Sequence, residues 1–150
     1  MNLGNVIVTM GAVDAILLDN GKDRKIPFRA RARLMRIRDV LRAEADIYEK
    51  ERIKLINELG VEKEENGQKV ISVPEDKTEE FYKSLEGVLT TEADVAFKRM
   101  TVEEFKDIEE LDITVTDGQL KALFEFVFDK SIAADFGANI AEPVTASKEA

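Results

Sequence analysis

The stretch PFRARARLMRIRDVLRAEADIYEKERIKLINELG, residues 27–60, carries the longest helical pattern in the chain. Proline is favoured in the first turn of a helix, and neither glycine nor a second proline follows Pro27 until Gly60. The pattern therefore predicts one helix of about 33 residues with an apolar stripe, which packs against another helix in this chain or in a second copy. The stripe consists of Ala30, Leu34, Ile37, Leu41, Ala45, Tyr48, Leu55 and Leu59.

The first half of this predicted helix carries six arginines, although the formal net charge of the whole chain is -9. At about 100° per residue, three arginines lie on each flank of the apolar stripe. We call the six residues the arginine ridge and take them as the candidate partner-binding residues. One flank holds Arg29, Arg33 and Arg36, and the other holds Arg31, Arg38 and Arg42.

Three kinds of partner fit the arginine ridge. The first is the chain's own set of 31 aspartates and glutamates, since surface ion pairs of this kind are common. The second is another protein chain, because cations on both sides of an apolar seam suit an acidic-rimmed hydrophobic groove. The third is nucleic acid, although no aromatic residues are interleaved with the arginines and the net charge repels phosphate. All three stay open at this point.

The composition excludes the most common kinds of catalytic site. The chain has no histidine and no cysteine, so it lacks the usual general base near neutral pH, the commonest transition-metal ligand and any disulfide. A hydrolase would have to work with carboxylates, lysine, tyrosine or serine. We therefore predict a protein that is not an enzyme, with no catalytic residue, no cofactor and no metal ligand.

An acidic run, VEEFKDIEELDITVTD at residues 102–117, is the other charged feature. It lacks the central glycine and the alternating oxygen ligands of an EF-hand loop. Glu103, Glu104 and Asp107 could in principle supply a general acid and base, but no pocket-forming motif accompanies them. We interpret the run as a solvated acidic surface, where the arginines could find counter-charges.

The remaining patterns predict short elements. Asn66-Gly67 favours a β-hairpin within residues 61–74, because both turn residues tolerate positive φ. Capping-box spacings predict three helix starts, at Asp76 with Glu79, Thr101 with Glu104, and Thr116 with Gln119. Apolar or alternating runs predict strands at 6–8, 94–99 and 112–115, with a helix from about residue 10 to residue 18.

These elements predict an α+β fold with one long amphipathic helix, several short helices and a small antiparallel sheet. We expect a single domain over residues 1–127, because the length suits one domain and no linker divides it. Residues 128–150 are weakly patterned, and we expect a C-terminal tail that is extended or bound to a partner. The apolar N-terminal stretch is interrupted by Asp14 and has neither the length of a membrane helix nor the layout of a signal peptide, so no membrane contact is expected.

The order of these segments resembles that of a family of small uncharacterised proteins of tailed bacteriophages of Gram-positive bacteria. The resemblance spans about residues 3–127 and rests on LGNVIV, LMRIRDVLRAEADIYEKERIKLINELG, ENGQKV, EEFYKSLEGVL, and the pairing of VAFKRMTVEEF with DITVTDGQLKALFEF. It implies a gene near those for virion tail components, and it implies no catalytic residue.

The resemblance and the charge pattern lead to one hypothesis and one alternative. The hypothesis is a non-enzymatic phage structural or accessory protein that binds other protein chains, either a second copy of this chain or virion components. The alternative is an intracellular phage effector that binds a host protein or nucleic acid through the arginine ridge. The expected location is the virion or the host cytoplasm.

Overall fold

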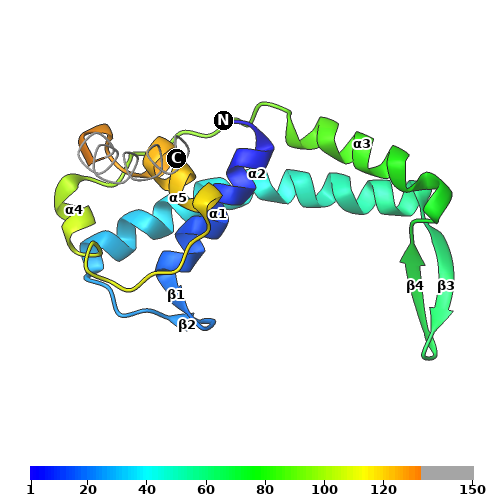
Figure 1. Ribbon diagram of the computed structural model, residues 1–150, viewed down its shortest axis with the longest axis horizontal. Helices are drawn as coiled ribbons and strands as arrows, with labels where there is room; N and C mark the ends of the chain where they lie inside the picture. The colour runs from blue at the N-terminus through cyan, green and yellow to red at the C-terminus, as the bar shows by residue number, and fades with distance from the viewer. Residues whose placement is uncertain (133–150) are drawn as a thin grey trace, which may run out of the picture. The chain divides into compact units, whose positions relative to one another are not determined.

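The computed structural model describes residues 1–132 of the chain (Figure 1). Its helices are α1 (Leu3–Leu17), α2 (Phe28–Leu59), α3 (Thr78–Leu89), α4 (Val102–Lys106) and α5 (Asp117–Ala122), with a 3-10 turn η1 (Glu75–Lys77) and a π-helical turn η2 (Leu123–Val127). Its strands form two antiparallel hairpins, β1 (Leu18–Asp19) with β2 (Lys22–Asp23) and β3 (Val61–Glu65) with β4 (Gln68–Ser72). The α+β prediction is confirmed, with two separate hairpins where one small sheet was expected.

The chain divides into two compact units. Unit 1 consists of Met1–Val6 and Arg42–Val95, and unit 2 consists of Ile7–Leu41 and the chain from Ala96 onward. Helices α1 and α2 each supply residues to both units. The limits of the single domain, residues 1–127, stay a prediction.

The predicted tail begins inside unit 2. Phe128 is 4% exposed and Ile132 is 3% exposed, and the Phe128 N–H donates to the Leu123 carbonyl at 2.8 Å. These side chains pack into the unit because they follow the apolar helix α5 and its π-helical turn directly. The rest of the predicted tail lies outside the described residues.

The long helix α2 has the bounds that its sequence predicts. Pro27 precedes its first turn, and the Gly60 N–H closes its last turn by donating to the Ile56 carbonyl at 2.7 Å. Its apolar stripe is covered unevenly along the helix. In the first half it is fully buried at Ala30, Leu34, Ile37 and Leu41, and in the second half it is only partly buried at Tyr48, Leu55 and Leu59.

The core of unit 2 is built by five helical segments and the loop before α4. Because apolar side chains from α1 and α2 alone cannot enclose one another, the C-terminal helices complete this core. The buried residues are Thr9, Ala12, Val13, Ile16, Leu17, Ala30, Leu34, Ile37, Leu41, Met100, Phe105, Ile108, Ala122, Leu123, Val127, Phe128 and Ile132.

The prediction of a strand at residues 6–8 is wrong, because α1 already begins at Leu3. The Asn5 N–H donates to the side-chain oxygen of Asn2 at 2.8 Å, so Asn2 is the N-cap of the helix. The β-branched run that follows favours strands only weakly, and the burial of Val6 and Val13 outweighs that preference.

Both hairpins turn at an Asn-Gly pair. Asn20 and Gly21 have φ of 52° and 80°, and Asn66 and Gly67 have φ of 52° and 77°. Positive φ at both central residues gives the turn twist that two-residue hairpins need. The prediction of a hairpin around Asn66 is confirmed, with Glu65 paired to Gln68 beside the turn.

The helix predicted after Asp76 is present as α3, but its predicted capping box is not. The turn η1 occupies Glu75–Lys77, so the N-cap of α3 is Lys77, whose side chain has no acceptor. The Thr78 hydroxyl instead donates to the Pro74 carbonyl at 3.1 Å. A proline that starts a 3-10 turn has therefore shifted the N-cap by one residue, from Asp76 to Lys77.

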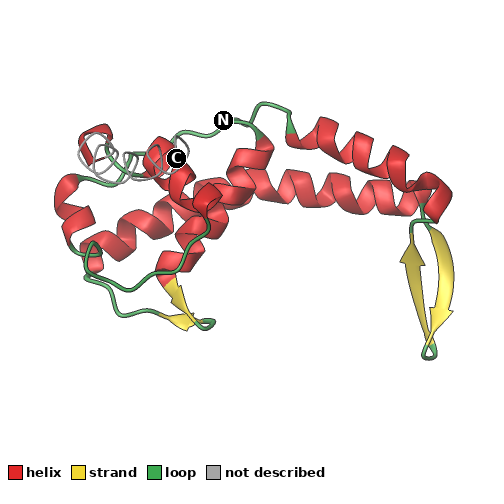
Figure 2. Ribbon diagram, in the orientation of Figure 1, coloured by secondary structure: helices red, strands yellow, loops and turns green. Residues whose placement is uncertain are grey.

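The strands predicted at 94–99 and 112–115 are wrong, since both segments are loops (Figure 2). Their side chains do alternate between partly buried and exposed, as the pattern requires. A strand also needs a neighbour with which its backbone can pair, and within residues 1–132 neither segment has one. Met100, just after the first segment, forms only an isolated bridge with Phe128.

The capping boxes at Thr101 and Thr116 are confirmed. The Glu104 N–H donates to the Thr101 hydroxyl at 3.2 Å, and the Thr101 N–H donates to the Glu104 carboxylate at 2.9 Å. Thr116 and Gln119 exchange the same pair of bonds at the start of α5. Both capping boxes form where they were predicted because each depends only on two residues that lie three positions apart in the sequence.

Candidate functional site

One flank of the arginine ridge contacts α4 within unit 2. Arg29 donates from Nε to Asp107 Oδ2 at 2.6 Å and from Nη2 to Asp107 Oδ1 at 3.0 Å, which is a two-point guanidinium–carboxylate contact. Arg33 donates from Nε to both carboxylate oxygens of Glu104 at 3.2 Å. The acidic run thus supplies counter-charges to these two arginines, as the sequence suggested.

These contacts keep the two carboxylates ionised. Burial alone would raise the pKa of Glu104, but hydrogen bonds from the Thr101 backbone and from Arg33 lower it below its usual value. The hydrogen bond from Arg29 lowers the pKa of Asp107. A carboxyl group that acts as a general acid at neutral pH needs a raised pKa. Both groups are shifted in the opposite direction.

The other flank of the ridge contacts α1 and the β1–β2 hairpin. Arg31 Nη2 lies 3.0 Å from Asp23 Oδ2, and Arg38 Nε lies 2.7 Å from Asp14 Oδ1. The side chains of Arg38 and Asp14 are 29% and 31% exposed. These two close atoms are poorly aligned and make no hydrogen bond to another described group, so their attraction is chiefly electrostatic.

The last two residues of the ridge, Arg36 and Arg42, are exposed and form no ion pair within residues 1–132. Four of the six arginines are therefore engaged inside the chain, which is the first of the three partner types considered from the sequence. A partner-binding role for the ridge stays a prediction, and Arg36 and Arg42 are its members without an ion pair among the described residues.

Arg24, which lies outside the ridge, has a structural role that the sequence analysis missed. Its guanidinium donates from Nε to the Ile16 carbonyl at 3.1 Å and from Nη2 to the Leu18 carbonyl at 3.2 Å. The Ile16 carbonyl belongs to the last turn of α1 and Leu18 follows that turn directly, so the cation also complements the helix dipole. A basic residue a few positions after a helix is the signal that could have identified this cap.

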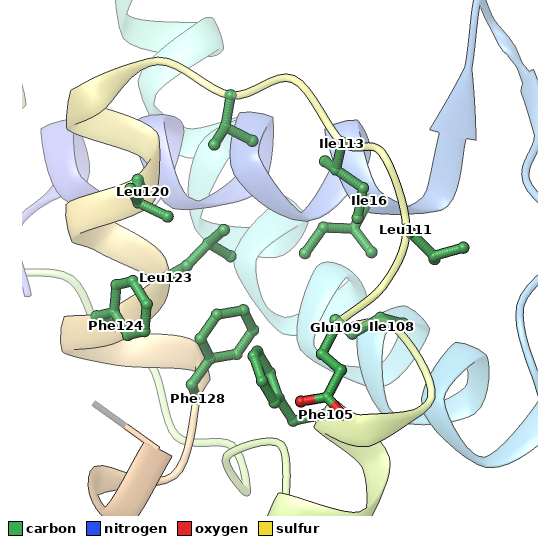
Figure 3. Close-up of a pocket in the computed structure, with 11 residues that line it drawn as sticks. Ile16, Phe105, Ile108, Glu109, Leu111, Ile113, Leu120, Leu123, Phe124 and Phe128 are labelled. Atoms are coloured by element: carbon green, nitrogen blue, oxygen red, sulfur yellow. The ribbon is translucent and has the colours of Figure 1, made fainter. Parts of the chain in front are cut away.

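Unit 2 contains an apolar pocket of about 170 Å³ (Figure 3). Side chains from α1, α4, the following loop, α5 and η2 converge on it, and Glu109 is the one charged residue that residues 1–132 contribute to its lining. The lining residues are Ile16, Phe105, Ile108, Glu109, Leu111, Ile113, Val115, Leu120, Leu123, Phe124 and Phe128. Because exposed Glu109 and several half-buried residues line it, the pocket is open to the surface.

The alternation that suggested a strand at 112–115 has a different meaning in the structure. Leu111, Ile113 and Val115 turn inward and line the pocket, while Asp112 and Thr114 are exposed. The segment is held in part by Arg24, whose Nη1 donates to the Asp112 carbonyl at 3.4 Å. Period-two burial therefore marks the wall of a pocket here, and sequence patterning alone cannot distinguish this wall from a strand.

Apolar side chains also lie on the outer face of α2 in unit 2. Phe28 is 83% exposed, the highest value among the large exposed hydrophobic residues, and Met35 is 45% exposed. With Ala32 they lie at positions i, i+4 and i+7, so they share one face of the helix. This face is opposite to the stripe that enters the core.

Two other kinds of site are absent from the part of the chain that the structure describes. No group of three or more Asp and Glu side chains is placed to hold a metal ion in residues 1–132. No helix in that range is both long and apolar enough to cross a membrane.

No protein-family model, no curated protein and no solved structure matches the chain.

Proposed function

We propose that this chain is a non-enzymatic phage structural or accessory protein that binds other protein chains in a virion or an assembly complex. The observation that carries the proposal is the incomplete burial of unit 1. Helix α3 lies alongside the second half of α2 (Figure 1), yet no residue of α3, all of which is described, is buried. Ile53 on α2 and Tyr82 on α3 are 47% and 62% exposed.

The β3–β4 hairpin adds to this exposed apolar surface. It projects from the end of the helix pair in unit 1 (Figure 1), and every residue of β3 is exposed. Val61 and Ile71 are 47% and 49% exposed. Two-stranded hairpins are marginally stable alone, and large exposed apolar side chains are typical of surfaces that another chain covers.

The non-enzymatic part of the proposal has separate support. The chain has no histidine or cysteine, and the pKa values of Glu104 and Asp107 are lowered. Glu104 belongs to a helix cap, and Glu104 and Asp107 each form an ion pair with an arginine. Protonating either carboxylate for proton transfer would weaken these contacts and destabilise the fold.

The alternative, an effector that uses the arginine ridge to bind a host protein or nucleic acid, is the weaker proposal. Phosphate contact needs accessible cations. Arg29, Arg31, Arg33 and Arg38 already face carboxylates of this chain.

The test is quantitative mass spectrometry of purified particles of the phage that encodes the chain. A fixed copy number relative to the capsid protein supports the proposal, and absence from particles despite abundance in infected cells overturns it. The double variant Ile53→Asp, Tyr82→Asp should lower incorporation, because it places charges on the exposed apolar surface of unit 1. Lys83→Asp on α3 is the matched control and should incorporate normally, since Lys83 is exposed and charged already. Circular dichroism melting of each variant separates a lost interface from a lost fold.

A further inference from the structure

We propose that two copies of this chain associate through unit 2, with Phe28 of each copy seated in the apolar pocket of the other. This inference goes beyond the proposed function, because it names a second copy as the occupant of a particular site. It rests on the pocket, on the exposure of Phe28 and on the charges beside each of them.

The pocket has the size and lining to hold a phenyl ring. Its volume is about 170 Å³, and aliphatic and phenylalanine side chains make up nearly all of its wall. A cavity of about 150 Å³ with a lining of this kind accepts one benzene molecule. Phe105 and Phe124 each pack edge-on against Phe128, with ring centroids 4.9 Å and 5.5 Å apart, so an entering ring would meet aromatic edges (Figure 3).

Among residues 1–132, Phe28 is the side chain best placed to enter such a pocket. At 83% exposed, it has little apolar contact within its own unit. It stands in the first turn of a helix, so its position is held by the backbone more firmly than that of a loop residue. Met35, on the same face of α2, can adapt its flexible side chain to the surface around the pocket.

The charges beside the two features are complementary. Glu109 lines the pocket, and its chain neighbours Glu110 and Asp112 are exposed. Lys25 lies three residues before Phe28, and Arg36, the chain neighbour of Met35, is exposed. A basic surface around the ring would therefore meet an acidic surface around the pocket, which favours association and fixes its orientation.

The two features are also close enough for a reciprocal exchange. Arg29, the neighbour of Phe28, contacts Asp107, and the pocket residues Ile108 and Glu109 follow Asp107 directly. The contact of Arg29 therefore joins the start of α2 to the C-terminal end of α4, where the pocket lining begins. A two-fold dimer needs this arrangement, because each copy presents the same surface to the other and both rings enter at once.

The test is sedimentation equilibrium of the purified full chain from micromolar to millimolar concentration. We expect a monomer–dimer equilibrium for the wild type and a dissociation constant at least about 100-fold higher for Phe28→Ala, since both contacts are lost. Val8→Ala is the control, because Val8 is an exposed apolar residue of α1 that does not line the pocket, and it should dimerise as the wild type does. A monomeric wild type, or a Phe28→Ala variant that dimerises normally, overturns the proposal.

A mixing experiment tests the pocket through a gain of association between two variants that associate weakly alone. Val115→Phe fills the pocket from its loop wall, and each variant alone should dimerise weakly. A mixture of Phe28→Ala, which keeps its pocket, with Val115→Phe, which keeps its ring, should associate more tightly than either variant alone. Failure of the mixture to associate contradicts the exchange, provided that circular dichroism shows Val115→Phe to be folded.

Benzene distinguishes a second copy from other occupants. Saturating benzene should compete with Phe28 and weaken the wild-type dimer. If benzene binds the pocket while the wild type remains monomeric, the pocket accepts an apolar ring but self-association is overturned. The mass-spectrometry experiment on phage particles tests variants of unit 1, whereas the association experiments test variants of unit 2. The proposed function and the proposed dimer can therefore be overturned independently.

Discussion

Arg33 and Glu104 form an ion pair that joins α2 to the start of α4 in unit 2. Nε of Arg33 lies 3.2 Å from the carboxylate oxygens of Glu104, and the two side chains are 18% and 12% exposed. Oε1 of the same carboxylate accepts the Thr101 N–H at 2.9 Å in the capping box. One carboxylate therefore serves both the helix cap and the contact between helices, and its loss should affect both.

Glu104→Gln should lower the free energy of unfolding by about 1–2 kcal/mol, because the charge-assisted bond from Arg33 becomes a neutral one. Glutamine still serves as the third residue of a capping box, so the cap remains. Glu104→Ala should cost about 1 kcal/mol more, since the cap is lost as well. Urea unfolding measures both changes. The control is Glu103→Gln, whose side chain is 81% exposed, and an equal effect there would contradict the role of Glu104.

Stability should fall as the pH drops through the acidic range. The folded state lowers the pKa of Glu104 and Asp107 below their ordinary values of 4.5 and 3.8, so it binds fewer protons than the unfolded state. Their contribution is present above those ordinary values and is lost as the pH falls through the folded values. Urea unfolding at a series of pH values should show this loss, and a Glu104→Gln, Asp107→Asn double variant should show a smaller one. An unchanged pH dependence in the double variant would contradict the assignment.

Arg38→Glu should destabilise unit 2 by about 2–4 kcal/mol, because it places a second carboxylate beside Asp14 in a site that is about two-thirds buried. Arg36→Glu makes the same change of charge two residues earlier on α2, where the side chain is exposed. That variant should stay within about 0.5 kcal/mol of the wild type. The midpoints of urea unfolding compare the two, and equal midpoints would mean that the contact with Asp14 contributes nothing.

Gly60→Ala should destabilise unit 1 by about 1–3 kcal/mol. A Cβ at this position would clash with the Ile56 carbonyl oxygen and would lie 2.5 Å from Cγ2 of Ile71, so the junction between α2 and the β3–β4 hairpin would have to shift. Amide hydrogen exchange in β3 and β4 should become faster. Gly87→Ala in α3 is the contrasting variant, since a Cβ there meets nothing within 4 Å and should add up to about 1 kcal/mol of helix stability. Slower exchange in Gly60→Ala would contradict this account.

The arginine ridge shows the limit of sequence reasoning about partners. The sequence identified the six arginines and two flanks, and it suggested that the acidic run could neutralise some of them. It could not assign Arg29 to Asp107, 78 residues away, or separate Arg38, which faces Asp14, from Arg42, which is exposed. Residues on the same flank of a helix have the same local pattern whether or not another element covers them.

The sequence by itself determined the features that depend on residues a few positions apart. These are the bounds of α2 between Pro27 and Gly60, the hairpin at Asn66-Gly67, and the capping boxes at Thr101 and Thr116. Only the tertiary structure decided that residues 112–115 form a pocket wall, that the stripe of α2 is buried from Ala30 to Ala45 and only partly buried beyond it, and that Phe28 stays exposed. Caps and tight turns are closed by neighbouring backbone groups, whereas burial and strand pairing depend on which distant segments pack against a given side chain.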